Sequence, residues 1–233
     1  MRLLYGYYFQ ILKLHRNKGM KQTLHNLRKS YEKDALLESN LKANPFDVFN
    51  QWFADAQNDE GVEEANAMAV STIGLDGFPK SRIVLLKEVE DESFIFYTNY
   101  TSEKANSIDN NAHISIHFFW PSLERQVIIK AVATKTSREK SNAYFMSRPR
   151  GSQLGAWASQ QSNEIDSRDD LEKQLHAVEE KFENKDVPLP EFWGGYQCKP
   201  VSFEFWQGRP NRLHDRILYT PNNDKWSLKR LQP

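Results

Sequence analysis

The sequence predicts a mainly β protein with flanking helices (α+β), built on an antiparallel barrel or sandwich. Five short β-rich runs follow one another between residues 67 and 136 with brief links, interrupted by one small helical patch. Asp76-Gly77, between the first two runs, is a strong hairpin signal. The pattern returns to β-rich runs from residue 200 onward. Short strands joined this closely favour antiparallel pairing around one core.

Composition limits the classes of function. The 233 residues are 39% hydrophobic and 27% charged, which is typical of a soluble globular protein. The formal net charge of +0 argues against a general nucleic-acid binder, which carries an excess of Lys and Arg. Cys198 is the single cysteine, so an intrachain disulfide framework is excluded and a reducing cytoplasm is expected.

The N-terminal residues 1–19 contain an apolar run that superficially resembles a signal peptide. Gly6 and Gln10 break the run, no small-residue cleavage site follows it, and it is too short to span a bilayer. We expect no membrane partner. Residues 1–19 are interpreted as an appendage outside the fold and a candidate translation artefact, because Met20 opens a more ordinary sequence.

Residues 20–60 are predicted to form an N-terminal helical segment that precedes the main domain at 61–233. The stretch 24–39 has helix-forming composition. Asn44-Pro45 is a cap followed by a first-turn proline, which predicts the start of a second helix. The apolar residues after it recur on one helical face and should pack on a core: Phe46, Phe49, Phe53 and Ala56.

The main domain alternates strands and helices. Strands are predicted at 67–74, 81–89, 93–99, 113–120, 125–136, 200–208, 212–220 and 225–231. Helices are predicted at 102–111, 137–146 and 171–182. Ser137 caps one of these helices, and Ser167 with Asp170 resembles a capping box before another. In the strand at 212–220, Arg212, His214 and Arg216 should alternate onto one face.

Several catalytic signatures are absent from the sequence. It has no GxGxxG, P-loop, HExxH or GxSxG motif, and no nucleophile with a base or carboxylate pair can be picked out. His113 and His117 would share a strand face, but no Asp or Cys lies nearby in sequence as a further ligand. We interpret them as half-buried strand histidines and expect no metal.

Cations, hydroxyls and aromatic side chains occur together in separate places. One set begins with Arg82 and continues to Lys104, in a Ser-rich turn that opens a helix, where free N–H groups attract phosphate. Another set spaces Tyr144, Arg148 and Ser152 four residues apart, and such groups suit a phosphate dianion. Two phosphate-binding sets suggest a phosphorylated cofactor and a phosphorylated substrate.

Seven motifs, in this order, resemble the pyridoxine/pyridoxamine 5'-phosphate oxidase family. They are RIVLLK, FYTN, ERQV, YFMSRPRGSQLGAW, Gln161-Ser162, VPLPEFWGGY and FWQGRPNRLHDR. The resemblance implies an FMN-binding split β-barrel, a homodimer with FMN at the subunit interface, and a role in vitamin B6 metabolism. It implies oxidation of pyridoxamine and pyridoxine 5'-phosphate to pyridoxal 5'-phosphate by hydride transfer to flavin, with O2 reduced to H2O2.

The resemblance also implies site residues. The positions implied for FMN are Arg82, Ile83, Val84, Leu85, Leu86, Lys87, Tyr97, Thr98, Lys104, Gln126, Gln161, Ser162, Trp206 and Arg216. Those implied for the substrate are Lys87, Tyr144, Arg148, Ser152, Arg212 and His214, with Arg28 and Tyr31 from a segment similar to one that closes over substrate. Arg212 and His214 are the expected catalytic residues, which orient the substrate and stabilise its charge.

One position departs from the family pattern. Many members have Ser-Arg-Lys where this chain has Ser102-Glu103-Lys104, so an arginine expected near the FMN phosphate is replaced by a carboxylate. Two other readings stay open beside the enzyme. One is a split-barrel relative that acts on another substrate, against which the Tyr144, Arg148 and Ser152 groups speak. The other is a non-catalytic flavin or pyridoxal phosphate carrier of the same fold.

Overall fold

A computed structural model describes residue 25 and residues 27–233 of the chain. The interpretation of residues 1–19 therefore lies outside the described residues. The chain divides into a unit at 1–30 and a compact unit at 31–233, and the fold described below is that of the second unit. None of the helices in the described part of the chain is both long and apolar enough to cross a membrane.

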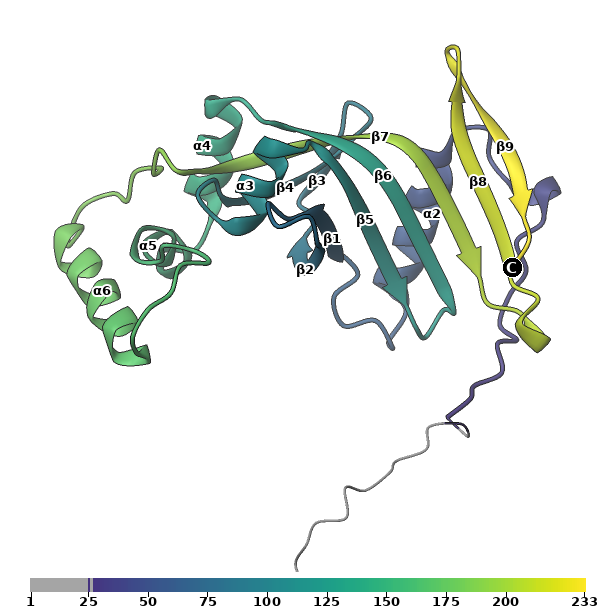
Figure 1. Cartoon of the computed structure of the whole chain (residues 1–233), viewed down its shortest axis with the longest axis horizontal. Coiled ribbons are helices and arrows are strands. Elements are labelled where there is room, and N and C mark those ends of the chain that lie inside the picture. Colours follow the sequence, from purple (N-terminus) through teal and green to yellow (C-terminus); the bar gives the residue numbers. More distant parts are fainter. Residues whose placement is uncertain (1–24, 26) are drawn as a thin grey trace, which may run out of the picture. The chain divides into compact units, whose positions relative to one another are not determined.

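The compact unit holds nine strands and seven short or medium helices among its described residues (Figure 1). The strands are β1 (Ala67–Ile73), β2 (Pro79–Leu85), β3 (Glu88–Glu90), β4 (Ser93–Asn99), β5 (His113–Trp120), β6 (Arg125–Lys135), β7 (Trp193–Gln207), β8 (Asp215–Asn222) and β9 (Lys225–Leu231). The helices are η1 (Glu38–Asn40), α2 (Pro45–Asn58), α3 (Glu103–Asn110), α4 (Arg138–Ser147), α5 (Arg150–Ala158), α6 (Arg168–Lys181) and η2 (Pro210–Arg212).

All nine strands belong to one antiparallel sheet, in the order β2-β1-β5-β6-β7-β4-β3 with β8 and β9 added beside β7. β7 is 15 residues long and pairs with different strands at its two ends. Its first residues pair with β4 at Trp193–Cys198, whereas its last residues pair with β8 at Phe203–Gln207. The sheet is therefore curled into a half-barrel, which confirms the predicted split barrel and rules out two stacked sheets.

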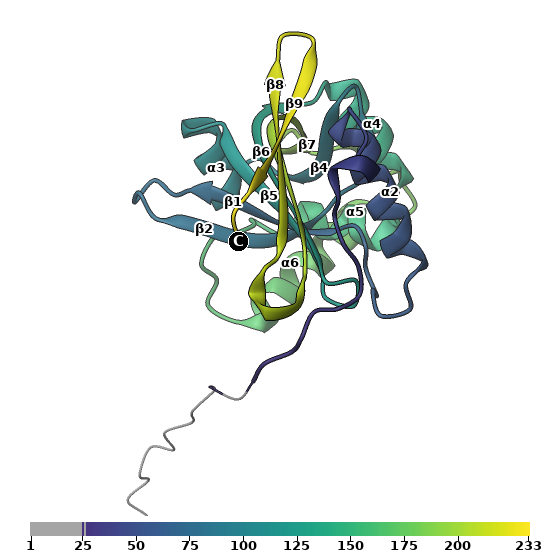
Figure 2. The same ribbon diagram turned by 90° about the vertical axis from the view of Figure 1, so that its right-hand side faces the viewer.

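Helix α2 covers the apolar face of this sheet. Asn44 accepts a hydrogen bond from the Phe46 amide and Pro45 opens the helix, as the sequence predicts. The Phe49 ring lies 4.8 Å from that of Phe94 on β4 and 5.2 Å from that of Phe118 on β5. Figure 2 shows α2 on the right of the sheet and the β1–β2 hairpin on the left. One core thus joins α2 to the strands.

The helix predicted at 24–39 is wrong within the described residues. Residues 27–37 are not helical, and only the short turn η1 follows. The cause is tertiary: the amides of Glu32 and Lys33 donate to the Glu124 carboxylate, and that of Leu36 donates to Asp215. These long-range acceptors replace helical hydrogen bonds and override the local helix propensity.

The placement of Arg212 and His214 on a strand is also wrong. β8 begins at Asp215, and Arg212 lies in the η2 turn that Pro210 opens. Asn211 and Arg212 both have positive φ, 57° and 63°, a backbone that ends the strand pattern. Of the three side chains expected to alternate on one strand, only Arg216 belongs to β8.

Other elements also differ from the prediction: β7 begins at Trp193 and not at residue 200, because its first residues pair with β4. The strand expected at 81–89 is broken into β2 and β3 around Leu86, whose amide donates to the Asn66 carbonyl outside the sheet. Helix α5 at Arg150–Ala158 is not predicted, because two glycines and a preceding proline obscure its pattern.

Candidate functional site

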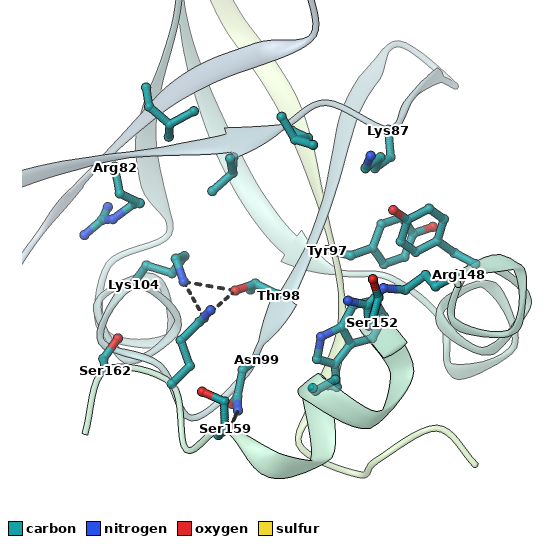
Figure 3. A pocket seen from close by; sticks show the side chains of 18 of the residues that line it. Arg82, Lys87, Tyr97, Thr98, Asn99, Lys104, Arg148, Ser152, Ser159 and Ser162 are labelled. Atoms are coloured by element: carbon teal, nitrogen blue, oxygen red, sulfur yellow. Dashed lines mark hydrogen bonds between the residues drawn. The ribbon is translucent and has the colours of Figure 1, made fainter. Parts of the chain in front are cut away.

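A cavity of about 820 Å³ opens where β2 and β4 meet helices α3, α4 and α5. Figure 3 shows cationic side chains at its two ends, with Arg82 and Lys104 at one end and Lys87 and Arg148 at the other. The lining residues are Arg82, Ile83, Val84, Leu85, Lys87, Tyr97, Thr98, Asn99, Glu103, Lys104, Tyr144, Arg148, Pro149, Ser152, Gly155, Ala156, Ser159, Gln161, Ser162 and Trp193.

The first end is built around the buried ammonium group of Lys104. Its Nζ donates to Gln161 Oε1 at 2.7 Å, to Thr98 Oγ1 at 3.0 Å and to Ser102 Oγ at 3.2 Å. All three acceptors are neutral. Burial, and then the neighbouring charge of Arg82, lower the pKa of Lys104 to about 8. A buried cation that lacks a carboxylate is an attractive position for an anion.

Arg82 adds a second cation to this end of the pocket. Its Nη1 donates to the Val70 carbonyl at 3.0 Å and to Thr72 Oγ1 at 2.9 Å, which fixes the guanidinium against β1. Burial lowers the pKa of Arg82, but a guanidinium stays charged at any physiological pH. Ser162 lines the same end with a positive φ of 77°.

The second end is built around Arg148, which follows α4. Its Nη1 is buried and has no hydrogen-bond partner in the described structure. The guanidinium lies over the Trp193 ring, 4.7 Å from the ring centroid, so its plane is held by aromatic contact. An unpaired buried donor costs free energy, which an anionic ligand recovers by accepting from it.

Two stacked tyrosines line the pocket beside Arg148. The rings of Tyr97 and Tyr144 lie 3.9 Å apart and 14° from parallel. Tyr97 donates its hydroxyl to Glu88 at 2.7 Å, and Glu88 is paired with Lys140 at 2.8 Å. Burial, and then the hydrogen bond to Glu88, raise the pKa of Tyr97, so it is a neutral donor at physiological pH.

A second group of predicted residues lies outside this cavity, across β6, β7 and β8. Gln126 pairs directly with Trp206, and Trp206 pairs directly with Arg216, so the three side chains form a row on one face of the sheet. Arg216 donates to Glu204 at 2.8 Å, which raises the pKa of Arg216. We call Gln126, Trp206, Arg216 and His214 the strand row.

His214 and Tyr31 pack on Trp206 in the strand row. The His214 ring centroid lies 4.6 Å from that of Trp206, and the Tyr31 ring stands edge-on to both. The Arg209 amide donates to His214 Nδ1 at 3.1 Å, so in the neutral ring the proton is on Nε2. Burial, and then the Arg212 charge, lower the pKa of His214. A Cβ at Gly208 would lie 2.7 Å from the Tyr31 ring, so Gly208 makes room for it.

The cavity brings together most residues expected for FMN and the substrate phosphate, from Arg82 to Ser162. Leu86 is an exception, since its side chain is buried in the core and does not line the cavity. Gln126, Trp206, Arg212, His214, Arg216 and Tyr31 do not line it either. Arg28 is exposed and belongs to the unit at 1–30, so its role stays a prediction.

Several residues that line the cavity are not predicted from the sequence. Pro149, Gly155, Ala156 and Ser159 line the cavity from α5 and its ends, at helical spacing from Ser152. Recognition of α5 would have predicted them. His117 lies outside the cavity but holds Gln126 through a contact of 3.0 Å between His117 Nε2 and Gln126 Oε1. Among the residues described, no group of three His, Cys, Asp or Glu could hold a metal ion.

Two family models match the chain. The model described as pyridoxamine 5'-phosphate oxidase matches residues 54–182. The model described as the C-terminal dimerisation region of pyridoxine 5'-phosphate oxidase matches residues 193–233. Together they cover the cavity and the strand row.

Curated relatives and solved structures agree with the family models. The chain is 56% identical to a pyridoxine/pyridoxamine 5'-phosphate oxidase of Flavobacterium johnsoniae over 89% of this chain and 98% of the relative. It is 52% identical to one of Christiangramia forsetii over 92% of this chain and 100% of the relative. The crystal structure of PhzG from Burkholderia lata, in complex with tetrahydrophenazine-1-carboxylic acid, has a TM-score of 0.79 at 25% identity, covering 88% of this chain and all of that one.

Proposed function

Because this chain belongs to the pyridoxamine 5'-phosphate oxidase family, we propose that it oxidises pyridoxamine and pyridoxine 5'-phosphate to pyridoxal 5'-phosphate with FMN and O2. One observation carries the proposal. A single cavity holds the buried ammonium group of Lys104 at one end and, at the other, the half-buried guanidinium of Arg148, whose Nη1 is buried without a partner. These two positions suit two phosphate groups, one on a cofactor and one on a substrate.

The residues at the Lys104 end fit the phosphate of FMN. Lys104 and Arg82 supply two positive charges, and Thr98 and Ser162 add hydroxyls within the same lining. The neutral acceptors that now hold Lys104 can be replaced by phosphate oxygens without leaving a charge unpaired. We assign this end to the cofactor. Figure 3 labels Arg82, Thr98, Lys104 and Ser162 at this end of the cavity.

The residues at the Arg148 end fit the phosphate of the substrate. Arg148 has a free buried donor, and Lys87, Tyr144 and Ser152 line the pocket around it. The Arg148 guanidinium lies over the rings of Trp193 and Phe145, which restrict its motion. Little conformational entropy is therefore lost when an anion binds.

We infer that the strand row acts together with the cavity of a second copy of the chain. Gln126, Trp206, His214 and Arg216 are absent from the cavity lining. Figure 1 shows α4 and α5 at one end of the sheet and β8 and β9 at the other. Residues 193–233, which hold most of the strand row, match a dimerisation region. We propose a homodimer in which the strand row of one subunit completes the cavity of its partner.

Within such a site the chain's residues bind and orient the substrate. Bound FMN would supply the redox chemistry: a hydride from the substrate C4' carbon would pass to the flavin, and two electrons with two protons would then pass to O2 to give H2O2. With the amine substrate, water would hydrolyse the oxidised product to pyridoxal 5'-phosphate and ammonia. His214 is held through Nδ1, which leaves its Nε2 proton to donate to substrate, and its lowered pKa favours this neutral form. Arg212 is exposed at the η2 turn and would add a positive charge beside it. The cytoplasmic location stays a prediction from the single cysteine.

The visible spectrum of the FMN-loaded protein tests this proposal. Anaerobic addition of pyridoxamine 5'-phosphate should bleach the flavin band, and air should restore it with pyridoxal 5'-phosphate formed. A flavin that binds but stays coloured would contradict the oxidase and leave a carrier or another redox substrate.

Mixing two inactive variants tests the shared site. Arg148→Met damages the cavity and His214→Ala damages the strand row, so a mixed dimer keeps one site with neither change. Refolding the two at equal amounts should return about a quarter of wild-type activity, because about half of the dimers are mixed and each has one intact site. Arg148→Met refolded alone is the control, assayed like the mixture at substrate concentrations well below KM: every cavity then carries the change, so no intact site forms. Failure of the mixture to exceed this control would contradict a site shared between subunits.

A further inference from the structure

Glu103 places a negative charge in a pocket that otherwise favours anions. It is the first residue of α3 and lines the cavity beside Lys104. The negative charge of Glu103 stabilises both cations at this end. It tends to raise the pKa of Arg82 and of Lys104, although burial has the larger effect and lowers both pKa values. The same field opposes an arriving phosphate. The sequence alone therefore does not explain how a phosphate dianion could bind next to Glu103.

Lys80 on β2 contacts both oxygens of this carboxylate. Its Nζ lies 2.7 Å from Glu103 Oε1 and 2.5 Å from Oε2. Lys80 precedes Arg82 by two residues on the same strand, so the two side chains leave β2 on the same face. The pair is half-exposed, with side-chain exposures of 58% for Lys80 and 45% for Glu103. Lys80 does not itself line the cavity.

We propose that Lys80 is a positioning residue for the cofactor phosphate, which holds the Glu103 carboxylate away from Arg82 and Lys104 by pairing with both of its oxygens. Lys80, Arg82 and Lys104 together carry three positive charges against the one negative charge of Glu103. The surplus of two matches a phosphate dianion. The inference rests on the proposed FMN function and adds to it a residue that does not touch the ligand.

The test compares FMN with riboflavin, which has the same ring system and ribityl chain but no phosphate. Binding of each to flavin-free full-length protein is followed by quenching of flavin fluorescence. Lys80→Met should raise the Kd for FMN on the order of five-fold, the size expected for a half-exposed ion pair. The Kd for riboflavin should not change. Glu103→Gln should leave FMN binding equal or tighter, and in that background Lys80→Met should cost less than about two-fold.

A matched control separates charge from anchoring of the helix. Lys135→Met removes an ion pair with Asp109 at the other end of α3, with similar exposures of 45% and 47%. It should change neither Kd. An equal loss in Lys135→Met, or an equal loss for riboflavin, would show that α3 is merely loosened and would overturn the inference.

Three further outcomes are also decisive. If Lys80→Met weakens FMN equally with Glu103 or Gln at position 103, Lys80 acts on the phosphate directly and the positioning role is wrong. An unchanged FMN Kd in Lys80→Met would overturn the inference alone. A wild-type protein that binds no FMN would overturn the proposed function with it.

Discussion

Both ends of the cavity carry a cation, a buried one at Lys104 and a half-buried one at Arg148, and the two are held in different ways. Lys104 is engaged by three neutral oxygen atoms from Thr98, Ser102 and Gln161. Arg148 is held by aromatic rings and keeps a buried donor without a partner. Lys104 is therefore satisfied before any ligand arrives, whereas Arg148 is satisfied only by a ligand. This difference suits a resident cofactor at the first end and an exchanging substrate at the second.

The largest effect is expected at the Arg148 end. Arg148→Met removes a half-buried charge that pairs with the substrate phosphate, so kcat/KM should fall on the order of 100-fold, about 3 kcal/mol. The loss should appear mainly in KM in steady-state kinetics at saturating FMN. The Kd for FMN should stay at the wild-type value. A parallel loss of FMN would contradict separate roles for the two ends.

A substitution at the Lys104 end should instead weaken FMN binding and leave substrate binding nearly unchanged. Lys104→Met removes a charge-assisted contact to the cofactor phosphate, and the Kd for FMN should rise roughly 30-fold, about 2 kcal/mol. With FMN added to saturation, KM for pyridoxamine 5'-phosphate should be close to wild type. Fluorescence titration measures the Kd for FMN, and steady-state kinetics measure the KM for pyridoxamine 5'-phosphate. A KM that rises as much as the Kd would contradict the assignment of the Lys104 end to the cofactor.

Binding of FMN should depend on pH through Lys104. Its pKa of about 8 in the free protein means that the ammonium form, which favours phosphate, predominates below that pH. The Kd should be flat between about pH 6 and 8 and rise by up to about tenfold per unit above 8. Lys104→Met should lose this rise. A wild-type Kd that improves above pH 8 would contradict the sign.

The smallest effect is expected from the Tyr97 hydroxyl. Tyr97→Phe keeps the ring that stacks on Tyr144 but removes the hydrogen bond to Glu88, which retains its ion pair with Lys140. The free energy of unfolding should fall by about 1 kcal/mol, a Tm decrease of roughly 2–4 °C by calorimetry. KM should change less than for Arg148→Met. A larger change in KM would place the hydroxyl in substrate binding.

The two ends also differ in how well the sequence predicts them. Arg82, Thr98 and Lys104 lie on or beside regular elements whose patterns are clear, so both their elements and their cluster are predictable. The α5 contribution was missed because Pro149 and two glycines hide a helix that tertiary contacts stabilise.

The strand row shows a different limit. The alternation of Arg212, His214 and Arg216 predicts a strand, but positive φ values at Asn211 and Arg212 place Arg212 in the η2 turn, and His214 lies between that turn and β8. Positive φ is uncommon for arginine, though not for asparagine, and it leaves little trace in a hydrophobic pattern. The helix prediction for residues 27–37 is wrong for a related reason. The carboxylates that accept hydrogen bonds from its amides, Glu124 and Asp215, lie far along the chain.

A crystal structure of the FMN complex tests the central assignment most directly. The FMN phosphate should lie within hydrogen-bonding distance of Arg82 and Lys104, with the Lys80–Glu103 pair intact and Arg148 left for the substrate. An FMN phosphate bound to Arg148, with the Lys104 end holding only its present neutral partners, would contradict it.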